Sequence, residues 1–285
     1  MILIVESGSS KSDIIGLNTD GSVAIRFQTL GLNPEILSND TIVKIIQELK
    51  ISQSVSDSTS HIYFYGAGCG TPKAKEQLSV AIASLFKYAT IAVYEDTYAA
   101  CFACNPSLSE SIICILGTGS NCSYFDGKQL VQKITSLGYM IMDDAGGVSF
   151  GRKLLRAYYF NQLPLELKNI IDKTHDLDAD TIKNNLYKKP SPNAYLASFT
   201  RFIINHKSHP FIKQLIENEF QEFIDNQIKQ FDNHAQVSVH FVGSVAYFLQ
   251  EELKNVASRN NIQIGNIIQK PIEKLIEFHQ KQIQH

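Results

Sequence analysis

The residues of this 285-residue chain that are best suited to chemistry stand directly after apolar runs. The first run, residues 2–5, ends at Glu6 and leads into a predicted turn of small residues that contains Lys11. Small residues let a backbone approach a ligand closely, and a run of exposed N–H groups binds anions. Lys11 adds a cation, and the Glu6 carboxylate can hold a Mg²⁺ that neutralises phosphates. The stretch therefore fits one wall of a nucleotide-phosphate site, although ordinary β-hairpins also carry glycine and serine.

Two more turns of small residues follow apolar runs. The segment ILGTGSN contains Gly117, Thr118 and Gly119, and VSVHFVGS ends in Gly243 and Ser244 before a predicted helix. A turn that opens a helix suits the adenosine or α-phosphate of a nucleotide, because helix N-termini attract anions. The Walker A sequence GxxxxGK[ST] does not occur. The turns therefore predict a nucleotide site of duplicated strand–turn–strand units rather than a P-loop.

Asp96, in VYEDTYAA, stands where a predicted strand gives way to a predicted helix. An attacking hydroxyl must lose its proton during phosphoryl transfer, and a carboxylate at such a junction can accept it. General-base assistance is typically worth ~10²–10⁴-fold. The alternative is that Asp96 only caps a helix that begins at Thr97, because aspartate is a favoured N-cap residue.

A pair of carboxylates, Asp143 and Asp144, follows LGYMIM. Paired carboxylates suit a polyhydroxyl ligand, whose OH groups are hydrogen-bond donors. The alternative is a solvated turn. Cys101 and Cys104 form a CxxC, but no second pair completes a metal site, so buried small hydrophobic residues are the better interpretation.

The elements that must position these residues are repeated along the chain. A strand, a small-residue turn, a strand, an Asp-Gly hairpin and a third strand occur at residues 1–29 and again at 111–134, about 110 residues apart. This pattern indicates an internal duplication at domain scale, with a boundary near residues 105–110. We expect further strands at 61–68, 90–96, 237–242 and 262–269, helices at 40–50, 72–89, 97–103, 246–258 and 270–283, a mostly helical region over 146–233 and a loop at 52–60.

Composition excludes several classes of protein. Lys and Arg number 26 against 28 Asp and Glu, a balance that argues against a nucleic-acid binder. There is no apolar run of ~18 residues, so we expect no membrane span, and the N-terminal residues lack the pattern of a signal peptide. Five irregularly spaced cysteines indicate a reducing compartment. We therefore expect a cytoplasmic protein.

The ordered set VESGSSKSD, YEDTYAA, ILGTGSN, LGYMIMDDAGG and VHFVGSVA resembles the actin-like ATPase and sugar-kinase superfamily. Within it, the chain is most similar to the BadF/BadG/BcrA/BcrD-type ATPase family, in the branch that includes N-acetylglucosamine kinase. The resemblance covers nearly the whole chain. It implies an α/β protein with two RNase H-like domains, 1–107 and 108–285, and an interdomain ATP cleft. The second domain would carry a helical insertion, and the closing helix is a candidate to pack back on the first domain.

The resemblance also implies roles for individual residues. Asp96 matches the catalytic carboxylate, and Glu6 matches a metal-supporting position that is usually Asp. The positions matching nucleotide-binding residues are Gly8, Ser9, Ser10, Lys11, Gly117, Thr118, Gly119, Gly243 and Ser244. The positions matching sugar-binding residues are Asn33, Gly119, Asn121 and Asp143. The family's G-D-E-G-S loop departs here, with Met142, Asp144, Ala145 and Gly146 at its other four positions.

These residues together lead us to expect an ATP- and Mg²⁺-dependent kinase of an amino sugar, N-acetylglucosamine first, with glucosamine and N-acetylmuramic acid as variants. The resemblance implies a homodimer. A second possibility is an ATPase that acts on a protein partner, as the dehydratase activators of the same branch do, although Cys69 has no companion at suitable spacing. A third is a non-catalytic sugar or nucleotide sensor, which the altered loop would favour.

Overall fold

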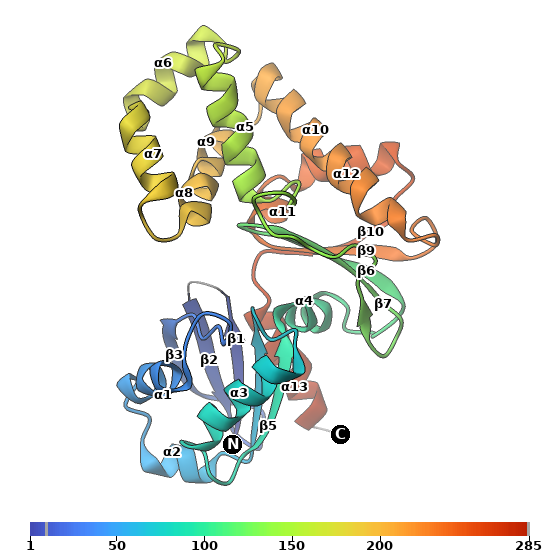
Figure 1. Cartoon of the computed structure of the whole chain (residues 1–285). Helices are drawn as coiled ribbons and strands as arrows, with labels where there is room; N and C mark the ends of the chain where they lie inside the picture. The colour runs from blue at the N-terminus through green and yellow to red at the C-terminus, as the bar shows by residue number, and fades with distance from the viewer. Residues whose placement is uncertain (9–10, 284–285) are drawn as a thin grey trace. The chain divides into compact units, whose positions relative to one another are not determined.

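The computed structural model describes residues 1–8 and 11–283. The chain divides into two compact units (Figure 1). The first unit contains Met1–Leu108 and Lys270–His285, and the second contains Ser109–Gln269.

The first unit is built on a five-stranded mixed sheet of order β3-β2-β1-β4-β5. Its strands are β1 (Ile2–Ser7), β2 (Lys11–Leu17), β3 (Val23–Leu30), β4 (His61–Gly66) and β5 (Thr90–Glu95). The central strand β1 is antiparallel to β2, where Glu6 pairs with Asp13, and parallel to β4, where Glu6 pairs with Tyr65. This register brings the ends of β1 and β4, and with them the residues that follow, to one edge of the sheet.

Helices cover both faces of this sheet (Figure 1). They are α1 (Asn39–Glu48), α2 (Gln53–Ser58), α3 (Pro72–Ala83), α4 (Asp96–Cys104) and α13 (Ile272–Ile283). Leu3 and Val5 pack in a cluster with α1 and α3, so the alternate residue Glu6 points toward the other face, which α4 and α13 cover. The last helix is held there by a hydrogen bond of 2.9 Å between Tyr65 and His279.

Three local predictions were wrong. The expected loop at 52–60 contains α2, because the Ser52 side chain accepts a hydrogen bond from the N–H of Val55 and caps a short helix. Helix α3 ends at Ala83 instead of reaching residue 89, and Phe86 packs into the core. The expected helix at 246–258 is interrupted at the buried Leu249.

The second unit repeats the sheet of the first. The strands β6 (Ser111–Leu116), β7 (Ser120–Phe125), β8 (Leu130–Val131), β9 (Ser238–Val242) and β10 (Ile264–Ile268) have the order β10-β9-β6-β7-β8. Three strands form an antiparallel meander and two add in parallel, as in the first unit. The predicted duplication of strand plan is therefore confirmed.

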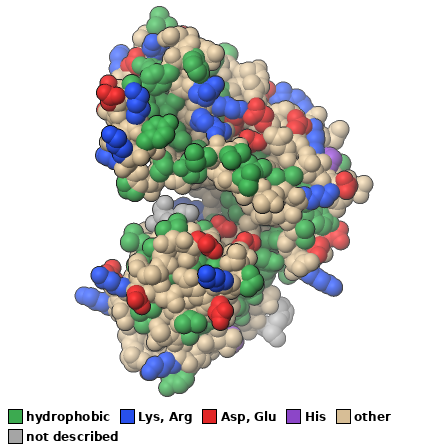
Figure 2. All heavy atoms as spheres, viewed as in Figure 1, with side chains coloured by type: hydrophobic (Ala, Val, Ile, Leu, Met, Phe, Trp, Pro, Cys, Tyr) green, Lys and Arg blue, Asp and Glu red, His purple; other side chains and the backbone are tan. Residues whose placement is uncertain are grey.

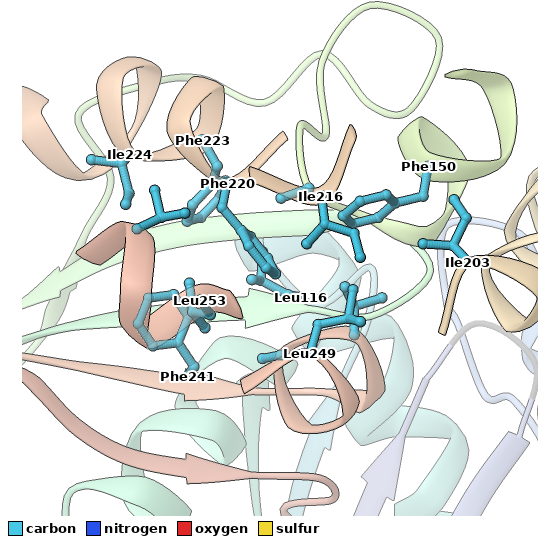
Figure 3. Packing of buried hydrophobic residues seen from close by; sticks show 14 of the residues in the cluster. Leu116, Phe150, Ile203, Ile216, Phe220, Phe223, Ile224, Phe241, Leu249 and Leu253 are labelled. Atoms are coloured by element: carbon cyan, nitrogen blue, oxygen red, sulfur yellow. The ribbon is translucent and has the colours of Figure 1, made fainter. Parts of the chain in front are cut away.

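The helices of this unit are α5 (Gly147–Tyr159), α6 (Leu165–Thr174), α7 (Ala179–Tyr187), α8 (Pro192–Ser198), α9 (Thr200–Asn205), α10 (Pro210–Asn226), the short η1 (Ile228–Gln230), α11 (Ser244–Phe248) and α12 (Gln250–Arg259). Figure 3 shows how α10 packs over the sheet: Phe220 and Phe223 lie above Leu116 of β6 and Phe241 of β9. Phe150 of α5 meets Phe220 edge-on, with ring centroids 6.0 Å apart. This packing fixes the start of α5 relative to the loop that follows β6. None of the helices in the described part of the chain is long and apolar enough to cross a membrane.

Candidate active site

A cluster of carboxylates lies at the end of β1 in the first unit. Glu6 is half-buried, and burial, followed by the charges of Asp13 and Asp96, raises its pKa to about 7. Lys11 and Lys270 oppose this rise but do not cancel it. The two lysines thus only partly offset the effects of burial and of the neighbouring carboxylates on Glu6, the predicted metal-supporting residue. A bound cation would stabilise the ionised form of this carboxylate.

Asp96 is the first residue of α4. Glu95, not Asp96, occupies the N-cap position, and its side chain makes no capping hydrogen bond. The alternative prediction, that Asp96 only caps a helix beginning at Thr97, is therefore wrong. The Asp96 carboxylate still accepts a hydrogen bond from the N–H of Thr97, which favours its ionised form. Burial, and next the charge of Glu95, outweigh that bond and raise the pKa of Asp96 to about 6. The side chain is therefore a half-buried carboxylate that is more basic than an ordinary aspartate and still ionised at neutral pH.

Two glycines of the loop between β4 and α3 let neighbouring side chains approach closely. A Cβ on Gly68, which has φ +78°, would collide with the side chain of Asn33, and a Cβ on Gly70 would collide with the carboxylate of Glu95. The Oδ1 of Asn33 accepts a hydrogen bond of 2.9 Å from the N–H of Glu35. Its Nδ2 donates to no residue that the structure describes, so it is available to a ligand. Sequence reasoning missed Glu95 and both glycines, although GAGCGT is a visible signal of close backbone approach.

The first small-residue loop is only partly described. Ser9 and Ser10, which match the family's phosphate loop, lie outside the described residues. Lys11 is the first residue of β2 rather than part of the turn, and its ammonium lies 3.7 Å from the carboxylate of Asp13. The N–H of Gly8 donates to the Lys11 carbonyl at 3.0 Å. Lys11 is thus held near the carboxylate cluster, with half of its side chain exposed.

Two buried hydroxyls connect this loop to the segment that carries Asn33. The Ser12 hydroxyl donates to the Ser7 hydroxyl at 2.8 Å, and the Ser7 oxygen accepts the N–H of Leu32 at 2.9 Å. Both serines have no exposed surface, so the bonds are shielded from water. The pair fixes the end of β1 relative to residue 33, and nothing in the sequence distinguishes these serines from their neighbours.

In the second unit, the loop after β6 is fixed by the start of α5. The N–H of Gly147 donates to the Gly117 carbonyl at 2.8 Å, and the N–H of Val148 donates to the Thr118 carbonyl at 2.9 Å. These bonds satisfy the first N–H groups of the helix and hold the loop in one conformation. Gly243 has φ +125°, and a Cβ there would collide with the backbone of Leu116, so only glycine fits.

These two loops line one pocket of about 650 Å³ within the second unit. Gly117 and Thr118 stand on one side and Ser244 on another, with Arg201 and Phe248 completing the wall. A concave site with glycine backbone, an aromatic ring and a guanidinium suits a nucleotide. The structure thus brings together residues that are about 125 positions apart in the sequence, while Arg201 was not predicted.

The carboxylate of Asp143 lies against Gly119, where a Cβ would collide with it. Burial has the largest effect on the pKa of Asp143 and raises it, and the charge of Asp144 raises it further. A hydrogen bond from the N–H of Ser120 and the charge of Arg152 lower this pKa, but the net shift is upward. Asn121, in β7, accepts a hydrogen bond of 3.0 Å from the Ser123 hydroxyl. Asp143 therefore lies against Gly119 and Ser120, and Asn121 is the next residue of β7.

The loop that carries Asp143 is supported by a buried glutamate. Asp143 and Ala145 have φ of +69° and +57°, a left-handed conformation that costs a non-glycine residue ~1–2 kcal/mol. Glu219 of α10, which is fully buried, accepts the N–H of Ala145 at 3.0 Å and forms an ion pair with Lys153. A glutamate inside the apolar stripe of a helix was a signal in the sequence that was not used.

Several solved structures similar to the chain are named as sugar kinases. A "putative N-acetylglucosamine kinase" from Porphyromonas gingivalis is 33% identical, covers 99% of this chain and 99% of its own, and superposes with a TM-score of 0.92. One from Chromobacterium violaceum is 14% identical over 97% and 98% of the two chains, with a TM-score of 0.71. A ROK family glucokinase from Streptomyces griseus, solved with glucose and AMPPNP, is 12% identical over 97% of both chains, with a TM-score of 0.57.

The last two likenesses show the fold alone. No family model matches the chain, and no curated protein matches it in sequence. The repeated sheet order and the full-length similarity define a two-domain actin-like ATPase fold of the sugar-kinase class. The chain belongs to the N-acetylglucosamine kinase-like branch of the BadF/BadG/BcrA/BcrD-type ATPase family.

Proposed function

We propose that this protein transfers the γ-phosphoryl group of ATP to a hydroxyl of an amino sugar, with N-acetylglucosamine as the substrate. The observation that carries the proposal is Asp96, a half-buried carboxylate at the start of a helix with its pKa raised to about 6. The full-length similarity to a protein named for N-acetylglucosamine phosphorylation supports the choice of sugar.

Asp96 acts as the general base in this proposal. It accepts the proton of the attacking hydroxyl as the new O–P bond forms, and the bond between the γ-phosphorus and the bridging oxygen breaks to release ADP. A carboxylate with a pKa near 6 is ionised at pH 7.5 and holds a proton better than a carboxylate with the usual aspartate value. The pocket of the second unit takes the nucleotide, with Gly117, Thr118 and Ser244 in its wall.

The carboxylates around Glu6 fit a Mg²⁺ ion. Glu6 would hold the metal, directly or through water. Burial raises its pKa most, and the negative charges of Asp13 and Asp96 raise it further, so a cation at this position would stabilise the ionised carboxylate. The described residues contain no group of three or more metal-binding side chains, as is usual for Mg²⁺ that keeps several waters and binds substrate phosphates. When bound, Mg²⁺ neutralises phosphate charge.

The residues that the family resemblance assigns to the sugar supply hydrogen-bond donors and acceptors for its hydroxyl groups. The Nδ2 of Asn33 donates to a sugar oxygen, while Asp143 and Asn121 accept hydrogen bonds from hydroxyls. Gly119 has no side chain that would displace Asp143. The five cysteines are all buried, and a reducing compartment fits buried thiols, which supports a cytoplasmic location. A homodimer is part of the proposal through the family resemblance.

The proposal is tested by coupled measurement of ADP release with Mg-ATP and a panel of N-acetylglucosamine, glucosamine, N-acetylmuramic acid, glucose and no sugar. Turnover with one amino sugar that is lost in the variant Asp96→Asn supports both the kinase and its base. ADP release that does not depend on sugar would instead indicate a partner-coupled ATPase. ATP binding with no turnover on any sugar would indicate a sensor.

A further inference from the structure

A second pocket in the second unit is not used by the proposed reaction. It measures about 390 Å³ and is lined by α5, α7, α8 and the turn at residues 139–140. It shares no lining residue with the candidate nucleotide pocket, and the adjacent residues Leu196 and Ala197 of α8 line different pockets. The two are therefore separate sites.

The interior of this second pocket is apolar. Leu155, Ile182 and Leu196 line it, and large hydrophobic side chains stand exposed around it, with Tyr187 81% and Met140 76% exposed. Figure 2 shows hydrophobic side chains gathered over this helical region with Lys and Arg side chains among them. Exposed apolar surface of this kind around a concave site marks a place where an apolar group is bound.

Two guanidinium groups provide the polar part of the pocket. Arg152 and Arg156 stand four residues apart on α5, so both face the same side of the helix. Arg152 donates to the Met140 carbonyl at 3.3 Å, and Arg156 lies over the ring of Phe160 at 5.0 Å. Neither forms an ion pair with any carboxylate in the described part of the chain, and no Asp or Glu lines the pocket.

The charge of Arg152 lowers the pKa of Asp143, and Glu222 shares a different pocket with Arg156, but neither carboxylate lines this pocket. A guanidinium beside apolar surface gains most from an anion that can accept two of its hydrogen bonds, and both carboxylate and phosphate have that geometry. An apolar floor with two such groups at its edge therefore matches a ligand with an apolar body and an anionic head.

From this arrangement we propose that the pocket between α5, α7 and α8 binds a small amphipathic anion. Its apolar body lies against Leu155, Ile182 and Leu196, and its carboxylate or phosphate is bound by Arg152 and Arg156. The pocket shares no lining residue with the candidate nucleotide pocket, so it can exist even if the substrate assignment is wrong.

The test uses the full-length protein with saturating Mg-ATP and the fluorescent aromatic sulfonate ANS as the probe. Octanoate and octyl phosphate compete with ANS for one site per chain, while octanol, which has the same apolar body and no charge, does not compete at equal concentration. Stronger competition by octyl phosphate identifies a phosphate head, and stronger competition by octanoate a carboxylate. Equal competition by octanol, or removal of ANS by Mg-ATP alone, overturns the proposal.

Variants test the arginines. Arg152→Gln/Arg156→Gln weakens octanoate binding at least tenfold. The matched control Lys183→Gln/Lys189→Gln removes two charges from exposed positions of the same helical region. This control leaves the affinity for octanoate unchanged. Should the arginine variant not fold, Tyr187→Asp at the exposed rim of the pocket is the second test. Its carboxylate repels the anion and weakens octanoate binding, whereas the uncharged Tyr187→Asn does not repel it. Unchanged octanoate affinity in either variant, or a pocket closed by a second copy at high protein concentration, contradicts the proposal.

Discussion

Replacing Asp96 with asparagine should stabilise the protein while it removes the proposed base. In the folded state the pKa of this carboxyl is about 6, against 3.8 for an aspartate in water, so burial disfavours its charged form. The difference is about 2 pKa units, and each unit is worth about 1.4 kcal/mol, which gives about 3 kcal/mol at most. The side chain is only half-buried and can keep some water, so we expect about 1–2 kcal/mol.

The sign follows from the raised pKa. The folded state binds the proton more tightly than the unfolded state, so the ionised carboxylate lowers stability fully above pH 6 and much less near pH 4. The asparagine side chain has the same shape, can accept the Thr97 N–H and carries no charge. Thermal unfolding of Asp96→Asn at pH 8 should therefore show a Tm higher than that of the wild type by about 2–8 °C. At pH 4 we expect about a fifth of the stabilisation found at pH 8.

Glu48→Gln, at an exposed position of α1, corrects for the general effect of pH on a carboxylate-to-amide change. A Tm for Asp96→Asn that is below the wild-type value at pH 8 would refute the argument that burial disfavours this charge. An equal gain at pH 8 and pH 4 would refute it as well, since the effect would then not depend on ionisation.

Two further substitutions test the surroundings of the proposed base and sugar loop. Glu95→Gln should move the acidic limb of the pH profile of kcat/KM to lower pH, because Glu95 raises the pKa of Asp96; a limb that stays in place or moves up would contradict this. Gly119→Ala should raise the KM for the sugar more than the KM for ATP, because its Cβ would displace Asp143. Gly117→Ala is the control, since a Cβ there meets nothing within 4 Å, and an equal rise in sugar KM in both variants would show that the displacement of Asp143 is not the cause.

The fold was accessible from the sequence because its signals are local. The Asp-Gly hairpins at Asp20 and Asp126 mark the two meanders, and both are present with the same strand order in the two sheets. Asp96 could be placed at a strand–helix junction because strand β5 and helix α4 are contiguous in the chain. The short helix α2 was missed because its polar sequence has no apolar period and depends on one serine cap.

The missing parts of the candidate site depend on contacts between distant segments. Arg201 joins the wall of the nucleotide pocket only because α9 packs beside the loop after β6. Glu219 supports Ala145 across 74 residues of sequence. Lys11 was assigned to a turn, but its pairing with Leu30 in the sheet makes it the start of a strand. No local sequence pattern indicates which of these distant segments come into contact.

The central claim is that the γ-phosphoryl group of ATP moves to the sugar. The most direct test incubates the protein with Mg²⁺, γ-³²P-labelled ATP and N-acetylglucosamine, then separates sugar phosphate from inorganic phosphate. We predict that the label appears in the sugar phosphate in a one-to-one ratio with ADP, and that Asp96→Asn lowers this transfer by ~10²–10⁴-fold. Label found only in inorganic phosphate, or transfer that is equal in Asp96→Asn, would contradict the account.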